Sequence, residues 1–338
     1  MSTMLITGAT GMLGSHVMLG ALEEGWKVRA LVRCPSKAAW LAARGVELAV
    51  GDIRDAGAVR HAARGCGAVV HTAAAIGSGR EPGHFFRGNV LGTEHVLVAA
   101  REASARLVHV SSTAVVGSAR YRCAEPTTED MPLPELPAWD AYGRTKQAAE
   151  CRVLEASRRG DVWATVVRPP MMYGCRDRQF VPRVAPVVER GYAPIIAGGA
   201  TTLPLVHAAS VAAGILTSLR HDRAVGRVYH LTEDRPVTVR MLVEAAVRGL
   251  GGTARAVEVP RPVARGGFLA LAGALSLVGR VDLARHARGS YLTLTRDNPF
   301  SAERARRELG WHPDIDPAQA LEDAFGWWSA RRRAGGGS

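Results

Sequence analysis

Short apolar runs alternate with helical patterns through the first half of the chain. The apolar runs predict strands at Met4–Thr7, Lys27–Val32, Glu47–Val50, Ala68–His71, Leu107–Ser111 and Trp163–Val167. Between them, apolar residues recur at helical spacing in Leu13–Glu24, Asn89–Glu102 and Tyr142–Arg158. Strands that alternate with helices favour a parallel sheet with crossover helices. We therefore expect an α/β fold with a doubly wound parallel Rossmann sheet.

The pattern changes after Pro169, where proline and glycine become frequent up to about Pro204. Further on we expect a strand at Val228–Leu231, a helix at Val239–Leu250, broken helix over Pro260–Arg296 and an amphipathic helix at Ala318–Arg332. A chain of 338 residues exceeds what one core usually holds. We expect a dinucleotide-binding domain over 1–170, a smaller, mainly helical substrate domain over 171–333 that returns to the sheet near 205–232, and a flexible tail at 334–338.

A glycine-rich segment joins the first predicted strand to the first predicted helix. It reads Thr7-Gly8-Ala9-Thr10-Gly11-Met12-Leu13-Gly14. Glycine permits a tight turn, a close approach of the backbone to a pyrophosphate, and close packing of the helix on the strand. The helix N-terminus then offers free N–H groups to the phosphates. The segment predicts a nicotinamide dinucleotide site that includes Gly8, Thr10, Gly11, Met12, Leu13 and Gly14.

The residues after the second strand bear on the choice of cofactor. A site for NAD usually places an acid here to bind the ribose 2′-hydroxyl, but this segment contains none. Arg33 stands there instead, with Lys37 nearby, and an arginine suits a 2′-phosphate. We therefore expect NADP(H), with NAD(H) as the alternative because Arg33 could equally be a solvated surface residue.

Later strand ends supply further candidate contacts to the cofactor. Asp52 and Ile53 follow the third strand, where they would border the adenine. Thr72, Ala73 and Ala74 follow the fourth strand and offer small side chains where the cofactor must lie close.

Tyr142 and Lys146 are four residues apart on a predicted helix, which places them on one face. A phenol has an ordinary pKa near 10, and a nearby ammonium group favours the phenolate and lowers that pKa. Ser111, Ser112 and Thr113 follow the fifth strand and could bring a hydroxyl to the same substrate oxygen. The combination predicts proton transfer to or from a carbonyl oxygen.

The overall charge of +12 comes from basic residues scattered along the chain, apart from the run Arg331–Arg333. Aromatic residues make up only 6% of the chain, too few for an obvious platform that stacks bases. We expect no nucleic-acid partner, and the charge could instead attract an anionic cofactor or substrate.

The cysteine and histidine patterns predict no metal site. The five cysteines are an odd number without metal-ligand spacing, and the eleven histidines include no metal-binding motif. We expect a cytoplasmic protein, since no signal peptide precedes the first strand. The apolar run Gly266–Gly279 is too short to span a bilayer, and we expect a core or substrate-pocket helix, with membrane contact as the alternative.

Taken together, these motifs resemble those of the extended short-chain dehydrogenases/reductases, in the NAD-dependent epimerase/dehydratase superfamily. The resemblance is greatest to the branch that includes 3β-hydroxysteroid dehydrogenases and dihydroflavonol reductases, and it covers nearly the whole chain. Besides the motifs above, it includes Gly51-Asp52, His71–Ala74, Asn89–Thr93, Arg168–Gly174, and the segment Phe300–Pro313.

The resemblance implies a role for each matching residue. Tyr142 matches the catalytic acid/base, and Lys146 matches the residue that holds the nicotinamide ribose. Ser112 matches the hydroxyl that polarises the substrate carbonyl, with Thr113 as the second choice. The resemblance also places Asn89, Ser111 and Pro169 on the cofactor side of the site. It further implies a homodimer.

Two positions depart from the nucleotide-sugar members of the superfamily. Those enzymes usually have an arginine where Leu203 stands, to hold a diphosphate, and an aspartate where Ala209 stands. A buried diphosphate without its cation would be costly. We therefore expect a bulky, ring-bearing, non-nucleotide substrate and reversible reduction of a ketone to a secondary alcohol. A nucleotide-sugar epimerase or dehydratase is the first alternative, and a non-catalytic dinucleotide-binding protein is the second.

Overall fold

The computed structural model describes residues 2–77, 82–118, 120 and 125–334. Its centre is a seven-stranded parallel sheet in the order β10-β6-β5-β4-β1-β2-β3. The strands are β1 (Thr3–Thr7), β2 (Lys27–Val32), β3 (Glu47–Val50), β4 (Cys66–His71), β5 (Arg106–Val110), β6 (Ala164–Arg168) and β10 (Val228–His230). The expected doubly wound α/β fold is confirmed, and each predicted strand lies within two residues of an observed one.

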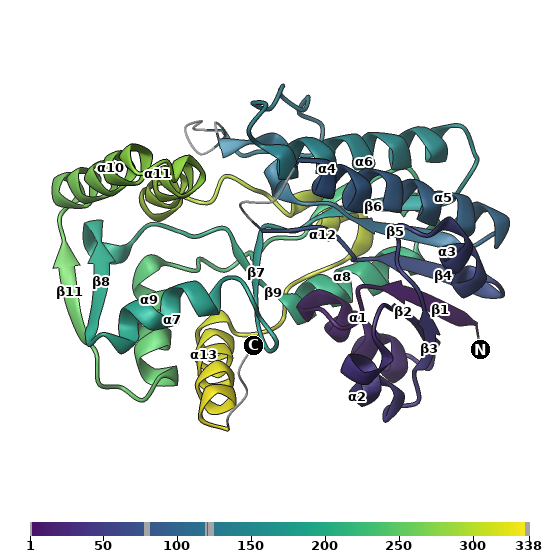
Figure 1. Ribbon diagram of the computed structural model, residues 1–338, viewed down its shortest axis with the longest axis horizontal. Helices are drawn as coiled ribbons and strands as arrows, with labels where there is room; N and C mark the ends of the chain where they lie inside the picture. The colour runs from purple at the N-terminus through teal and green to yellow at the C-terminus, as the bar shows by residue number, and fades with distance from the viewer. Residues whose placement is uncertain (1, 78–81, 119, 121–124, 335–338) are drawn as a thin grey trace.

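Helices cover both faces of this sheet (Figure 1). One face carries α1 (Met12–Glu23) and α8 (Ala208–Arg220), and the other carries α3 (Ala56–Ala63), α5 (Gly92–Glu102) and α6 (Ala141–Arg158). Side chains alternate along β1, so Met4 and Ile6 enter one core and Leu5 enters the other. Short elements link these parts: η1 (Pro35–Ala38), α2 (Ala39–Ala42), α4 (Pro82–Phe85), η2 (Phe86–Leu91), η3 (Thr113–Val116) and η6 (Asp222–Ala224).

A second apolar core lies beyond the end of β6. It is built mainly by α7 (Val181–Glu189), α9 (Val239–Gly249), α13 (Pro317–Arg333) and β8 (Tyr192–Ile196). The remaining elements are β7 (Met171–Tyr173), β9 (Leu205–His207), β11 (Arg255–Val259), η5 (Ala197–Gly199), α10 (Arg261–Leu277), α11 (Val281–Thr295) and α12 (Glu303–Leu309). The sequence pattern did not indicate the parallel pairs β8–β11 and β7–β9. Strands β7 and β9 are very short, and the residues of β11 are mostly exposed, so its sequence lacks a continuous apolar run.

The apolar run Gly266–Gly279 is not a core helix, so that prediction was wrong. Within α10 only Ala264 and Ala272 are buried. The second core is already filled by α7, α9 and α13, and α10 packs instead against α11 through alanines such as Ala272 and Ala284. Phe268 and Leu275 pack partly against this contact, while Val263, Leu269, Leu271 and Leu277 of α10 remain exposed to solvent.

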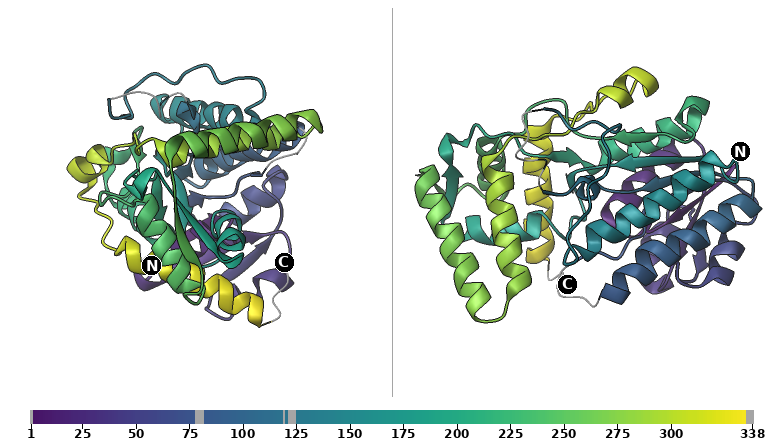
Figure 2. Two further views of the ribbon diagram at one scale, coloured as in Figure 1. Left: turned by 90° about the vertical axis from the view of Figure 1, so that its left-hand side faces the viewer. Right: turned by 90° about the horizontal axis from the view of Figure 1, so that it is seen from above.

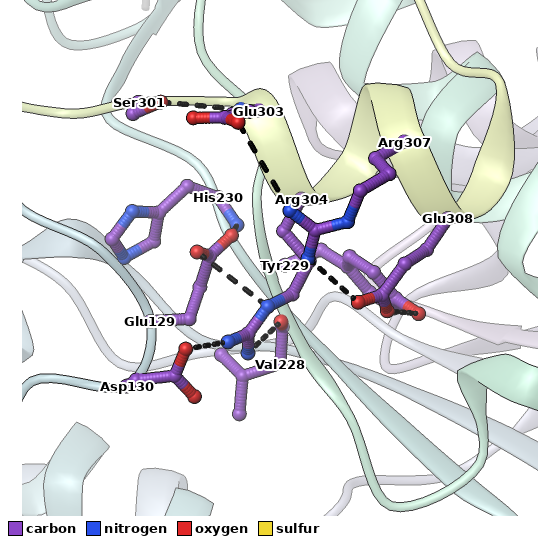
Figure 3. Close-up of polar contacts among 10 residues, drawn as sticks. All are labelled: Glu129, Asp130, Val228, Tyr229, His230, Ser301, Glu303, Arg304, Arg307 and Glu308. Atoms are coloured by element: carbon purple, nitrogen blue, oxygen red, sulfur yellow. Dashed lines mark hydrogen bonds and ion pairs between the residues drawn. The ribbon is translucent and has the colours of Figure 1, made fainter.

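A polar network fixes the edge of the sheet at β10 (Figure 3). The backbone N–H of His230 donates to Glu129 Oε1 at 2.7 Å, which occupies a donor of the edge strand. Arg304 of α12 pairs with Glu129 and Asp130, and Tyr229 donates to Glu308 Oε2 at 3.0 Å. The network therefore holds the segment that contains Glu129 and Asp130 against the sheet edge at β10.

Candidate active site

The glycine segment forms a bare backbone cradle at the carboxyl end of β1. Gly8 has φ of +77°, a left-handed conformation that favours glycine. A Cβ on Gly14 would lie 2.3 Å from the carbonyl oxygen of Gly8, so the turn and α1 are in direct backbone contact. Gly11 precedes α1 without any side-chain cap, which leaves the N–H groups near Thr10, Met12 and Leu13 at the helix end without a side-chain acceptor. This cradle fits a dinucleotide pyrophosphate.

The end of β4 is attached to the glycine turn by hydrogen bonds. Thr72 Oγ1 donates to the carbonyl of Thr7 at 2.7 Å, and Thr7 Oγ1 lies 2.7 Å from His71 Nδ1. A Cβ on Gly8 would meet Thr72 Oγ1 at 2.6 Å and the backbone nitrogen of Ala73 at 2.8 Å. The end of β1 and the end of β4, with Ala74 following, therefore form one wall of the cradle.

Asn89 connects this wall to the helix that carries Tyr142. Its Oδ1 accepts from the Ala75 N–H at 2.7 Å, and its Nδ2 donates to the Ala75 carbonyl at 3.1 Å and to Thr145 Oγ1 at 3.1 Å. Asn89 is itself buried in the π-helical turn η2. Its contacts are structural supports of the loop after β4 and of α6.

Tyr142 and Ser112 meet at the carboxyl edge of the sheet. Asp140 caps α6 by accepting from the Gly143 N–H at 2.8 Å, which sets the start of the helix. Ser112 caps η3 after β5, accepting from the Ala114 N–H at 3.1 Å. Burial raises the pKa of Tyr142 above its ordinary value, and the side-chain hydrogen bond with Ser112 opposes that shift. The expectation of a lowered tyrosine pKa was therefore wrong for this site.

Lys146 does not supply the stabilisation of the phenolate that the sequence predicted. Its Nζ donates to the Val110 carbonyl at 2.6 Å, in a buried position. Burial lowers the pKa of Lys146 to about 8, and Glu150 opposes the shift. The pKa of Tyr142 is raised by desolvation of its phenol, with a smaller push in the same direction from Asp140 and an opposing hydrogen bond from Ser112.

The two hydroxyl residues beside Ser112 have different surroundings. Ser111 is buried, and its Oγ has no hydrogen-bond partner within the described residues. Thr113 is the buried first residue of η3, and its N–H donates to the Pro169 carbonyl at 3.1 Å. Ser112 is thus the member of the cluster that faces Tyr142.

A buried ion pair supports helix α6, and the sequence analysis did not predict it. Glu150 of α6 pairs with Arg168 at the end of β6, with both side chains almost fully buried. The guanidinium Nε lies 3.1 Å from each carboxylate oxygen. Tyr142, Lys146 and Glu150 follow one another at intervals of four, so helical spacing was the signal that could have indicated Glu150.

The candidate adenosine contacts lie at the ends of β2 and β3. Arg33 and Lys37 are exposed after β2. Asp52 is held by Arg54 through a bidentate contact of 3.0 and 2.9 Å, and this hydrogen bonding lowers the pKa of Asp52, with a smaller contribution from Arg33. Ile53 packs toward Gly92, where a Cβ would meet its side chain at 2.9 Å. Arg33 therefore lies close enough to Asp52 for its positive charge to help lower the pKa of that carboxyl.

A cavity of about 580 Å³ lies beyond the end of β10. Its lining includes Leu203, Thr232 and Phe300, but none of Ser112, Tyr142 or Lys146. The charged side chains of the lining are Arg235, Arg261, Arg296 and Arg306 against Glu125, Glu233, Asp234 and Asp297. The four cations are matched by four carboxylates, so the cavity lacks the positive excess that a diphosphate needs.

Other chemistry is sparse in the part of the chain that the structure describes. Those residues contain no group of three or more side chains that could hold a metal ion. Cys34, Cys66, Cys151 and Cys175 are free thiols, while Cys123 lies outside the described residues. No helix within the described ranges is both long and apolar enough to cross a membrane.

Comparison with solved structures shows the same fold in nucleotide-sugar enzymes. The chain matches a dTDP-glucose 4,6-dehydratase from Streptomyces venezuelae, solved with NAD, with a TM-score of 0.73, 24% identity and 98% of each chain covered. It matches a UDP-glucose 4-epimerase from Thermotoga maritima with a TM-score of 0.75, 19% identity, and 98% and 99% of the two chains covered.

Curated relatives are more similar in sequence. A 4-hydroxy-2-methyl-3-oxo-4-farnesyl-3,4-dihydroquinoline-1-oxide ketoreductase from Stigmatella aurantiaca is 32% identical, with 94% of both chains covered. A 2-alkyl-3-oxoalkanoate reductase from Stenotrophomonas maltophilia is 28% identical, covering 94% of this chain and 96% of the relative. The model of the NAD dependent epimerase/dehydratase family matches residues 4–231. With this match, and with a Rossmann fold whose helix α6 carries Tyr142 and Lys146, the chain belongs to the NAD-dependent epimerase/dehydratase family.

Proposed function

We propose that this protein is an NADP(H)-dependent oxidoreductase that interconverts a ketone and a secondary alcohol on a bulky, apolar substrate. The proposal is carried by the cluster at the carboxyl end of the sheet, where Ser112 follows β5 and α6 presents Tyr142 and Lys146, whose Nζ donates to the Val110 carbonyl at the end of β5. The nicotinamide cofactor, when bound, supplies or accepts the hydride. Gly8, Gly11 and Gly14 would hold its pyrophosphate, and Lys146 would hold its ribose.

Residues of the chain itself transfer the proton to and from the substrate oxygen. In the reductive direction Tyr142 is protonated at neutral pH, as an ordinary phenol is and as its raised pKa reinforces, and it donates that proton to the substrate oxygen. Ser112 donates a hydrogen bond to the same oxygen and stabilises the negative charge that develops there. In the oxidative direction Tyr142 must first lose its proton to solvent, and the phenolate then accepts the proton of the alcohol.

Three observations support an apolar substrate. The relatives from Stigmatella and Stenotrophomonas are named for reductions of ketones that carry long apolar groups. Ile76, Trp139 and Met171 are large apolar side chains that remain exposed in segments flanking the candidate site. The balanced charge of the cavity near Leu203 gives no support to a diphosphate.

We also propose that the chain divides by role, with cofactor contacts in 1–170 and substrate contacts mainly in 171–333. The chain after 205 contributes to both parts, since α8 and α12 pack on the sheet while α9 and α13 build the second core.

Oxidation of NADPH in the presence of candidate ketones tests the proposal. The panel should pair 3-oxo compounds that carry long alkyl, prenyl or fused-ring groups with short polar ketones, and include UDP- and dTDP-hexoses. We expect turnover with members of the apolar set. Conversion of a nucleotide sugar, or no turnover of any ketone by protein that binds the cofactor, would overturn it.

A further inference from the structure

Helices α10 and α11 form an antiparallel hairpin that leaves several large apolar side chains in solvent. Figure 2 shows the two helices side by side at one end of the molecule, with the turn that joins them at its periphery. The exposed residues are Leu269, Leu271, Leu277, Val278, Val281 and Leu283. Between its helices the hairpin buries alanines, with Phe268 and Leu275 partly buried against them, so this packing does not explain the side chains that remain exposed.

The exposure is greatest at the turn. Leu277 is 90% exposed and Val278 is 71% exposed, and Val281 follows directly after the turn. Each of these side chains costs free energy in water, and adjacent ones form a contiguous apolar tip. Such a tip favours binding to an apolar surface, because binding would bury these side chains away from water.

The hairpin is also strongly basic. The stretch 261–296 has a net charge of +5, from six arginines and one aspartate. The arginines are at positions 261, 265, 280, 285, 288 and 296, and the aspartate is at position 282. A basic helix pair with an apolar tip complements a surface that is anionic outside and apolar beneath.

The hairpin lies beside the candidate active site. The Arg285 guanidinium lies 5.1 Å from the centre of the Trp139 ring, and Trp139 stands three residues before Tyr142. Trp139 is itself more than half exposed, and a tryptophan suits the boundary between headgroups and acyl chains. The exposed apolar surface of the hairpin therefore extends toward the segment that leads into α6.

We propose that the α10–α11 hairpin docks this protein on an anionic lipid bilayer. Leu277 and Val278 enter the outer acyl region, while Arg265 and Arg280 meet the lipid phosphates. The contact is peripheral, in keeping with helices too short or too polar to span a bilayer within the described residues. Docking does not depend on the proposed reaction.

Flotation with vesicles tests this proposal on the full chain. We expect wild-type protein to float with phosphatidylcholine vesicles containing phosphatidylglycerol, less with pure phosphatidylcholine, and less at high salt. The double variant Leu277→Ser/Val278→Ser should lower partition at least about tenfold, and Arg280→Glu roughly tenfold. Val50→Ser removes an exposed apolar side chain from β3 and should leave partition unchanged.

Several outcomes would overturn the proposal. The first is that the wild type does not float with anionic vesicles at low salt. The second is that the wild type and the double variant float equally. A third is a self-association that the double variant abolishes, without lipid binding, which would make the hairpin a contact between copies. Thermal melts should match for all variants, because the replaced side chains are exposed. Tyr142→Phe should float like the wild type, so a failure of the proposed reaction stays distinguishable.

Discussion

The hydroxyl of Tyr142 keeps its proton through neutral pH, since an ordinary phenol has a pKa near 10 and burial raises the pKa of this one further. Tyr142→Phe removes that proton and keeps the ring. We expect the turnover of ketone to fall about 10²- to 10⁴-fold, the usual size of general acid–base catalysis. Affinity for the cofactor, measured by fluorescence titration, should change little. A variant that retains more than half of the wild-type kcat would exclude this role.

Arg33 lies exposed after β2, where it can reach a 2′-phosphate. A charge-assisted bond of this kind is typically worth about 1.5–3 kcal/mol, which corresponds to roughly a ten- to hundredfold preference for NADPH. We expect Arg33→Ala to remove most of that preference. The measurement is the ratio of kcat/KM for NADPH and NADH.

Two controls accompany the Arg33 measurement. Arg44→Ala removes another arginine from the same region, one that stacks on Trp40, and should leave the cofactor ratio unchanged. If wild-type protein uses both cofactors equally, or if the ratio survives in Arg33→Ala, then Arg33 is only a surface residue.

At the scale of elements, the candidate site depends on how closely β1, α1 and β4 approach. Gly14→Ala would place a methyl group 2.3 Å from the Gly8 carbonyl oxygen, so the turn must shift. We expect a loss of cofactor affinity of at least about tenfold and a lower Tm, since cofactor contacts and packing share this backbone.

A matched glycine substitution shows whether the effect is local. Gly266→Ala in α10 adds a methyl group that meets nothing within 4 Å. Alanine is favoured over glycine inside helices by roughly 0.5–1 kcal/mol. Gly266→Ala should therefore leave cofactor binding unchanged and Tm equal or slightly higher. Equal behaviour of the two variants would argue against the cradle.

For the molecule as a whole, we expect buried histidines to make the free energy of unfolding depend on pH on the acid side of neutrality. Burial lowers the pKa of His16 to about 4, of His71 to about 3 and of His230 to about 3, and it lowers the pKa of His109 strongly. The unfolded chain binds these protons near pH 6.5, whereas the folded chain does not. Stability is therefore greatest above pH 6.5 and falls as the pH drops below it.

Thermal or urea unfolding between pH 7.5 and 5 measures this dependence. His109 has no hydrogen-bond partner within the described residues, so His109→Leu removes one titrating group at little cost in hydrogen bonds. The slope of stability against pH should fall by about one proton in that variant. An unchanged slope would mean that His109 does not contribute.

The oligomeric state is a second prediction for the whole molecule. We expect a homodimer that pairs α5 and α6 of each copy, two helices that Arg152 and Glu94 already join within one chain. Light scattering at micromolar concentration should give about twice the 35.9 kDa of one chain. A mass near that of one chain would rule the dimer out.

The sequence by itself determined the sheet, the glycine turn and the spacing of Tyr142 and Lys146. These features are local, because strand and helix periods, turns and helix faces depend on residues close together in the chain. The strand ends of a parallel sheet also meet at one edge, so the order of motifs placed Ser112 near Tyr142.

Only the tertiary structure decided what each of these groups touches. The pairing of Glu150 with Arg168 and the bridge from Asn89 to Thr145 join residues that no local pattern relates. The raised pKa of Tyr142 and the exposure of Leu277 likewise reversed what the sequence suggested. Burial is the common reason, because it depends on which distant segments arrive to cover a side chain, and protonation and exposure both follow from it.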